Sequence, residues 1–235
     1  MFWFLSKKQR FRYGHDIHSH LLPGIDDGVK GMEESIAAIR KLHALGITRF
    51  TVTPHIAPPW MPNSAESILP LLGELRARLD AEGIGVEMEA AAEYRVTESM
   101  LSLLERPLLA ASDRTLLIEH SYVTPSPSFG KVLDRVQQLG YFPVLAHPER
   151  YPFMQDRVEA ECRRLRDRDC RVQLNLLSFA GKYGSAPEKA AWRLIKSGQV
   201  DFVASDAHCE ADADLLRDFL YSRSAEKLDR FFRRW

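Results

Sequence analysis

The stretch Glu33–His55 reads EESIAAIRKLHALGITRFTVTPH and contains the pattern that sets the fold class. Apolar residues at positions 36, 39, 42 and 45 fall at helical spacing, which predicts a helix over Glu33–Leu45 that Gly46 ends. The apolar run Ile47–Thr53 then predicts a strand. Strands that alternate with amphipathic helices are typical of a parallel α/β fold.

The same alternation extends in both directions from this stretch. Further strands are predicted near Tyr13–His18 and over Ile84–Ala92, Leu116–Glu119, Phe142–Ala146, Val172–Leu176 and Phe202–Ala204. Further helices are predicted from a cap near Asn63 or Ser64 up to Gly83, over Thr97–Leu104, Ser128–Leu139, Val158–Arg168 and Glu188–Lys196, and from Glu210 onward. These segments make seven β/α units that no repeat or linker divides. We therefore predict one α/β domain over residues 1–235, and a single (β/α) barrel is one architecture that suits a chain of this length.

The composition is that of an ordinary globular protein. The 235 residues are 45% hydrophobic and 27% charged, and 32 Lys and Arg balance 32 Asp and Glu. This balance gives no basic bias for a nucleic-acid partner. Cys162, Cys170 and Cys209 are an odd number without CxxC spacing, so neither a disulfide framework nor a thiolate zinc site is indicated. We expect reduced cysteines and a cytoplasmic location.

The N-terminal segment Met1–Leu5 is apolar, but it is too short for a signal-peptide core and comes before Lys7 and Lys8, which is the reverse of signal-peptide order. No other stretch has the about 18 uninterrupted apolar residues of a membrane-spanning helix. For Phe2–Leu5, packing on the fold or on a partner subunit is favoured over a weak amphipathic membrane anchor.

The ends of the predicted strands carry the functional signal. In chain order they present His18 and His20, His55, Glu93, Glu119, His147, Asn175, and finally Asp206 and His208. In a parallel α/β barrel the carboxyl ends of all strands meet on one face, where active sites of this architecture lie. We therefore expect these distant residues to surround one cavity.

Several of these residues also have a simpler interpretation. His18 and His20 lie two apart on one side of a strand and suit one metal ion, but alone such a pair is more often solvated or part of a core. Asp26-Asp27-Gly28 is good turn chemistry, and a turn above the barrel mouth is able to deliver one carboxylate to a metal. His55 follows Pro54 and is equally compatible with a surface loop.

Glu93 and Glu119 end otherwise apolar runs, where an unpaired carboxylate is costly, so a metal-ligand role is favoured. His147-Pro148-Glu149-Arg150 adds a ligand histidine and a guanidinium whose planar fork suits a phosphate group. The alternative for that segment is a surface ion pair of Glu149 with Arg150 or its neighbours. The chain has no P-loop, GxGxxG, GxSxG or CxxxxxR pattern, so a cysteine-nucleophile phosphatase is unsupported.

The motif order resembles the polymerase-and-histidinol-phosphatase (PHP) family, and more narrowly its bacterial capsule and exopolysaccharide protein-tyrosine phosphatases. The matching strings run from His15 to His208 and include HSHLLPGIDDG at 18–28, TPH at 53–55, AEY at 92–94, HPER at 147–150 and SDAH at 205–208. The resemblance implies a distorted seven-unit barrel of the PHP type, with a site at the carboxyl ends of the strands for three metal ions, often manganese, with iron or zinc as alternatives.

The resemblance also implies a ligand set. His18, His20, Glu93 and Asp206 would hold one ion; Glu93 would bridge to a second ion held by Glu119 and His147; Asp27, His55 and His208 would hold the third. Arg150 would bind the phosphoryl group. Family members commonly continue after the last histidine with Asn and then a second phosphate-binding arginine, whereas this chain reads HCEADA at 208–213. Arg217 is one substitute, although a solvated helix arginine is the simpler interpretation.

The function implied is a metal-dependent protein-tyrosine phosphatase that acts on the tyrosine-rich tail of a capsule-synthesis autokinase, and a homo-oligomer is compatible with it. Attack by a metal-activated water requires no covalent enzyme intermediate. Alternatives are a PHP phosphatase for a small molecule such as histidinol phosphate, a PHP nuclease, a metal-dependent amide hydrolase and a metal-stabilised scaffold. Balanced charge disfavours the nuclease, Glu119 in the slot of a carboxylated lysine disfavours the amide hydrolase, and a complete ligand set disfavours the scaffold.

The loop Ala57-Pro58-Pro59-Trp60-Met61-Pro62 directly follows His55. Its prolines stiffen the chain, so Trp60 and Met61 are candidates for an apolar wall over the metal face that contacts a flat aromatic ring. Packing of Trp60 onto the barrel is an equally good interpretation.

Overall fold

The computed structural model describes residues 14–232, so the predictions for Phe2–Leu5 and for the start of the first strand lie outside the described residues. The strands are β1 (His15–Asp16), β2 (Arg49–Val52), β3 (His55–Ile56), β4 (Glu87–Ala90), β5 (Glu93–Arg95), β6 (Thr115–Glu119), β7 (Phe142–Ala146), β8 (Arg171–Asn175) and β9 (Phe202–Ala204). The helices are α1 (Met32–Ala44), α2 (Ala65–Ala81), α3 (Glu98–Leu103), α4 (Phe129–Gln138), α5 (Pro152–Gln155), α6 (Val158–Arg166), α7 (Leu176–Phe179), α8 (Ser185–Ser197), α9 (Glu210–Leu220) and α10 (Arg223–Phe232), with a 3-10 turn at Pro148–Arg150. Among the described residues, none of the helices combines the length and apolar character needed to span a bilayer.

The strands form two parallel sheets, in the orders β1-β2-β4 and β3-β5-β6-β7-β8-β9. Two predicted strands are each divided between these sheets. Ile47–Thr53 becomes β2, and after Pro54, which has no N–H to donate, the chain continues as β3 in the other sheet. Ile84–Ala92 is likewise replaced by β4 and β5. Each of these two chain segments therefore contributes one strand to each sheet.

The first and last strands approach each other just beyond their ends. Ser19 forms an isolated parallel bridge with Ala207, and the His20 N–H donates to the Ala207 carbonyl at 2.9 Å. The Asp206 N–H donates to the His18 carbonyl at 2.9 Å. The predicted parallel α/β fold class is confirmed. The two separate sheets do not establish a closed barrel, nor that the fold consists of seven β/α units.

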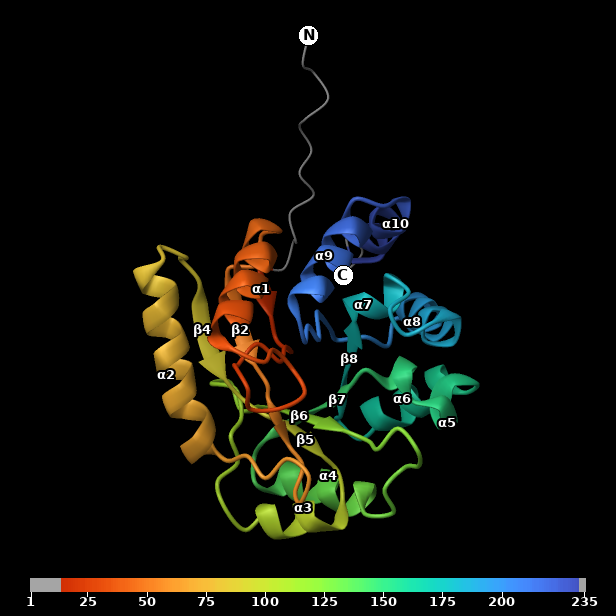
Figure 1. The fold of residues 1–235 in the computed structure, drawn as a ribbon. Helices are drawn as coiled ribbons and strands as arrows, with labels where there is room; N and C mark the ends of the chain where they lie inside the picture. Colours follow the sequence, from red (N-terminus) through yellow and green to blue (C-terminus); the bar gives the residue numbers. More distant parts are fainter. Residues whose placement is uncertain (1–13, 233–235) are drawn as a thin grey trace.

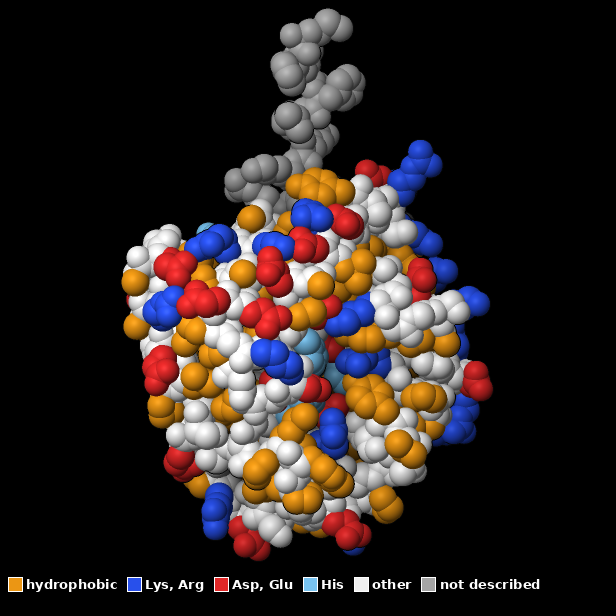
Figure 2. All heavy atoms as spheres, viewed as in Figure 1, with side chains coloured by type: hydrophobic (Ala, Val, Ile, Leu, Met, Phe, Trp, Pro, Cys, Tyr) orange, Lys and Arg blue, Asp and Glu red, His pale blue; other side chains and the backbone are white. Residues whose placement is uncertain are grey.

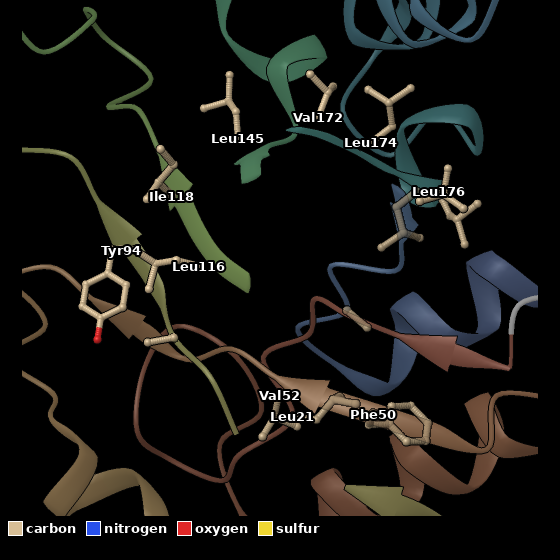
Figure 3. Packing of buried hydrophobic residues seen from close by; sticks show 14 of the residues in the cluster. Leu21, Phe50, Val52, Tyr94, Leu116, Ile118, Leu145, Val172, Leu174 and Leu176 are labelled. Carbon is tan, nitrogen blue, oxygen red and sulfur yellow. The ribbon is translucent and has the colours of Figure 1, made fainter. Parts of the chain in front are cut away.

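Helices surround the strands on the outside of the molecule (Figure 1). Alternate residues of the strands belong to the main buried cluster, as Leu116 and Ile118 of β6 and Val172 and Leu174 of β8 do (Figure 3). Leu117, Val144 and Ala146 form a separate buried cluster with Phe202 packed against it. Because strand side chains alternate in direction, this separate cluster lies on the opposite face of the same strands.

Several element predictions were incomplete. Short helical segments at Pro148–Arg150, Pro152–Gln155 and Leu176–Phe179 lie within predicted loops or strand ends, and β8 ends at Asn175 instead of Leu176. The helix expected at Glu188–Lys196 begins earlier, at Ser185, and the region after Glu210 divides into α9 and α10. Segments of four residues or fewer are too short to show a helical period, which is why periodicity missed them.

Candidate metal centre

The strand-end residues predicted to ligate metal come together in the structure. Four overlapping groups of possible ligand atoms contain all of them: His20/Asp27/His55/His208, His18/Glu93/His147, His18/His20/Asp206 and His55/Glu93/Glu119. Asp27 is the most open of these side chains, at 52% exposure, whereas Glu93, Glu119 and Asp206 are buried. Figure 2 shows histidine side chains at the bottom of a hollow that is bordered by charged groups.

The deepest group consists of His18, His20, Glu93 and Asp206. The His18 Nε2 atom lies 3.2 Å from each of His20 Nε2, Glu93 Oε2 and Asp206 Oδ1. The His20 Nε2 atom lies 3.2 Å from Glu93 Oε2 and 3.4 Å from Asp206 Oδ1. A tetrahedral metal with ligand bonds of about 2.0–2.1 Å separates its ligand atoms by about 3.3–3.4 Å. These separations therefore fit one small divalent ion.

The other ligand atoms extend this cluster on two sides. On one side, Asp27 Oδ1 lies 3.5 Å from His55 Nε2 and 3.6 Å from His208 Nε2. On the other, Glu93 Oε1 lies 2.9 Å from His147 Nε2, while Glu93 Oε2 lies 3.3 Å from His55 Nδ1. The two carboxylate oxygens of Glu93 thus face different histidines, as a bridging ligand would.

The grouping differs in one respect from the ligand set implied by the family resemblance. Glu119 was expected to share an ion with His147, but its Oε1 atom lies 3.4 Å from His55 Nδ1, and those two residues form a group with Glu93. His147 instead groups with His18 and Glu93. Glu93 belongs to both groups.

Buried polar atoms without hydrogen-bond partners provide a test of whether a cation fits. His55 Nδ1, Glu119 Oε2, His147 Nδ1 and Asp206 Oδ1 are all buried and unpartnered within the described residues. A buried polar atom without a partner lowers the stability of the fold unless a bound ligand or ion interacts with it. Although burial alone would lower it, the carboxylates of Glu93 and Asp206 raise the pKa of His18 to about 9. The carboxylates therefore favour positive charge in the pocket, and the donor set of imidazoles and carboxylates fits divalent metal ions.

The backbone is strained at two of these positions. His147, immediately after β7, has φ 35° and ψ 55°, and Asp206, two residues after β9, has φ 53°. Residues other than glycine rarely adopt left-handed backbone angles, and where they do the cause is often functional geometry. Here the unusual angles occur at two of the candidate ligands.

Other side chains hold the histidine rings in place. His20 Nδ1 lies 2.7 Å from Asp26 Oδ2, and Asp26 also accepts the backbone N–H groups of Gly28 and His55. Although burial alone would raise it, His20 lowers the pKa of Asp26. His18 Nδ1 is 2.9 Å from the Gln173 Oε1 atom. Partners of this kind fix the ring orientation of a metal-ligating histidine.

Arg150 reaches the rim of the same cluster. Its Nη1 donates to Asp206 Oδ2 at 2.6 Å, and its Cζ lies 3.9 Å from the Tyr183 ring centroid and 4.9 Å from that of Tyr122. Although burial alone would lower it, the Asp206 carboxylate raises the pKa of Arg150, so the guanidinium remains charged. Two aromatic rings and a carboxylate hold the planar cation beside the candidate ligands.

Glu149 contradicts the alternative of a surface ion pair with Arg150. Its side chain is buried, and its Oε1 accepts the Asn175 backbone N–H at 2.9 Å and the Ser178 hydroxyl at 2.7 Å. It ties the Pro148–Arg150 turn to the end of β8 and to Ser178 of α7. The physical reason is that the strained turn after β7 directs residue 149 inward while residue 150 points to the cluster.

Arg217 and Trp60 lie outside the cluster. Arg217 is 48% exposed on α9 and pairs with Asp214 and Asp218 of the same helix. Trp60 is 72% exposed, in a turn where Ala57 and Met61 form an isolated bridge. This exposure contradicts packing of Trp60 onto the barrel.

Sequence analysis missed several residues of the site. Arg95, Tyr122, Tyr183 and Gln173 all contact candidate ligands or Arg150. A signal for Arg95 was available, since it lies two residues after Glu93 and strand residues two apart share a face. Tyr183 had no such signal, because it enters the site from the loop between α7 and α8.

A family model for capsular polysaccharide synthesis, CpsB/CapC, matches residues 14–214. The chain belongs to the CpsB/CapC family. Tyrosine-protein phosphatase YwqE of Bacillus subtilis is 30% identical over 195 residues, which cover 82% of this chain and 76% of that protein. Tyrosine-protein phosphatase CpsB of Streptococcus pneumoniae is 30% identical over 201 residues, covering 82% of each chain.

A third CpsB/CapC relative, the putative tyrosine-protein phosphatase CapC of Staphylococcus aureus, is 27% identical over 195 residues, covering 82% of this chain and 76% of that protein. A solved structure is also similar, from a crystallographic study of YwqE from Bacillus subtilis and CpsB from Streptococcus pneumoniae, described as unique metal-dependent tyrosine phosphatases. It matches with a TM-score of 0.76 and 28% identity, and covers 92% of this chain and 91% of its own.

Proposed function

We propose that this chain is a metal-dependent protein-tyrosine phosphatase that removes phosphate from a tyrosine autokinase of capsule or exopolysaccharide synthesis. The metal ligands are His18, His20, Asp27, His55, Glu93, Glu119, His147, Asp206 and His208. Manganese is the metal we favour, with three ions per chain; iron and zinc are alternatives.

The ion-sized arrangement of His18, His20, Glu93 and Asp206, with Arg150 bonded to that same Asp206, is the observation that carries this proposal. A metal site alone would suit many hydrolases. A guanidinium adjoining it adds a docking point for a doubly charged phosphoryl group, because the planar fork of Arg donates to two phosphate oxygens. The relatives named as tyrosine phosphatases support the choice of substrate.

The residues of the chain then have separate tasks. When bound, the divalent ions would supply an activated water and would neutralise phosphoryl charge. Arg150 binds the phosphoryl oxygens, and the rings of Tyr122 and Tyr183 keep its guanidinium in place. The phenolate that leaves phosphotyrosine has a pKa of about 10 and needs little protonation, so no general acid is assigned.

The finer architecture and setting are also part of the proposal. We regard the two sheets as one distorted PHP barrel of seven units, in which the divided strands count once each and the Ser19–Ala207 bridge joins the first unit to the last. We further propose that residues 1–235 form one domain, that the protein acts in the cytoplasm, and that it forms a homo-oligomer.

The test measures activity and metal content on the same purified protein. With manganese, the protein should hydrolyse an aryl phosphate and a phosphotyrosine peptide much faster than phosphoserine peptide or histidinol phosphate. Preference for histidinol phosphate would contradict the assignment as a tyrosine phosphatase. Absence of phosphatase activity at full metal content would contradict assignment to any class of phosphatase.

Substitutions test the metal centre itself. His20→Ala and Asp206→Ala should each lose metal and nearly all turnover while remaining folded. His43→Ala is the matched control, because His43 lies on α1 and bonds to the Ile47 carbonyl, away from the cluster. Full metal occupancy and near-normal rates in both cluster variants would contradict the proposed ligand set.

A further inference from the structure

This chain lacks the second phosphate-binding arginine that its family resemblance anticipates after the last histidine. Arg217 does not replace it, because its guanidinium pairs with Asp214 and Asp218 on the exposed side of α9. If a second guanidinium binds phosphate here, it must come from another element.

Arg95 on β5 meets the geometric requirements. It lies two residues after Glu93 on the same strand, so the two side chains leave the strand on the same side. Its Nε donates to Glu119 Oε1 at 2.8 Å, and its Nη2 lies 2.7 Å from that same oxygen. The side chain is 23% exposed. Because a guanidinium has five N–H donors, this contact leaves donors free at the mouth of the site.

Arg95 and Arg150 contact the cluster in the same way. Each guanidinium is held by one buried carboxylate, Glu119 for Arg95 and Asp206 for Arg150. Glu93 Oε2 connects the two carboxylates: it lies 3.3 Å from His55 Nδ1, which is 3.4 Å from Glu119 Oε1, and 3.2 Å from His18 Nε2, which is 3.2 Å from Asp206 Oδ1. Both guanidiniums therefore adjoin one continuous cluster of candidate ligands, where a single phosphoryl group would contact both.

We propose that Arg95 is a second phosphoryl-binding residue, which works with Arg150 on different oxygens of the same group. The inference rests on the proposed phosphatase function. Two guanidiniums that bind one phosphoryl group would fix its orientation relative to the metal ions. They would also distribute its negative charge over two charge-assisted hydrogen-bonding contacts. The competing explanation is that Arg95 only orients Glu119.

Phosphate binding to the metal-loaded protein separates these explanations without depending on turnover. We would compare Arg95→Met and Arg95→Lys with the wild type in calorimetric titrations with inorganic phosphate, and measure metal content on each sample. The matched control is Arg217→Met, which removes an exposed arginine outside the site.

At equal metal content, Arg95→Met should weaken phosphate binding and kcat/KM by about ten- to a hundredfold, the range expected when one charge-assisted contact is lost. Arg95→Lys should recover part of this loss, because it keeps the charge without the fork. Arg217→Met should behave like the wild type.

Two results would overturn the proposal. One is unchanged phosphate affinity per metal-loaded site in both Arg95 variants, even where metal content falls, which would leave Arg95 only a positioning role for Glu119. The other is an equal loss in Arg217→Met. A wild-type protein that binds phosphate through Arg95 but hydrolyses no aryl phosphate would contradict the proposed function instead.

Discussion

Gly28→Ala tests whether the loop at residues 21–28 positions the candidate metal ligands. A Cβ atom added at Gly28 would lie 2.1 Å from the His20 carbonyl oxygen and 2.6 Å from the His20 Cβ. Ordinary contacts begin at 3.4 Å, so the backbones must separate by about 1.3 Å. The obstacle is backbone and Cβ, which cannot swing aside as a flexible side-chain tip does.

The separation would disturb the metal site as well as the fold. His20 and Asp27 lie on the two sides of this contact, and metal–ligand distances tolerate only about 0.2 Å. Overpacking of this kind costs roughly 1–3 kcal/mol. For a chain of this size each kcal/mol lowers Tm by about 2–4 °C, so we expect a decrease of about 2–12 °C in chelator.

The assay is thermal unfolding with and without manganese, together with metal content. Gly31→Ala is the matched control, because a Cβ at Gly31 has no atom within 4 Å and its φ of −156° suits any residue. We expect Gly28→Ala to lose stability in chelator and to gain less stability from metal than the wild type does. A Tm and metal content equal to those of Gly31→Ala would refute the reasoning.

Three further substitutions test other parts of the site. Arg150→Lys keeps the charge but loses the fork, so kcat/KM should fall about ten- to a hundredfold with metals retained; unchanged efficiency would exclude phosphoryl binding. Trp60→Ala should leave Tm nearly unchanged, because the side chain is 72% exposed, and should impair a phosphotyrosine peptide more than a small alkyl phosphate; equal losses would exclude an aromatic wall. Burial raises the pKa of Glu149 to about 7, so its contribution to folding stability is lost as pH rises from about 4.5 to about 7. Glu149→Gln should therefore gain about 2.5 kcal/mol of unfolding free energy relative to wild type between pH 5 and pH 8 in denaturant titrations with chelator, and parallel pH profiles would contradict this.

Sequence reasoning located the strands well because apolar runs and helical periods are local properties. It did not foresee that Ile47–Thr53 and Ile84–Ala92 each continue into a second sheet. That division depends on how neighbouring strands pair, and no pattern within one strand records it. Proline at 54 was the one local sign, since it cannot donate to a sheet.

The candidate ligands were also predictable, because the carboxyl ends of parallel strands meet on one face. The residues that hold these ligands in place were harder to predict from the sequence. Asp26 was assigned a turn, and the structure gives it both the turn and the contact with His20. For Glu149 the sequence offered only the alternative of a surface ion pair, because its burial depends on Asn175 and Ser178, which follow it by 26 and 29 positions.

The contact between residues 18–20 and 206–208 has a consequence for biosynthesis. His18 and His20 are made early, whereas Asp206 and His208 are made nearly 190 positions later, and backbone hydrogen bonds join the two segments. Two of the four candidate ligand groups, His18/Glu93/His147 and His55/Glu93/Glu119, are already made by residue 147, whereas the other two need Asp206 or His208. A polypeptide that stops before residue 206 therefore lacks the deepest group, and the complete centre forms only after synthesis has passed residue 208. Contacts so distant in sequence also slow folding.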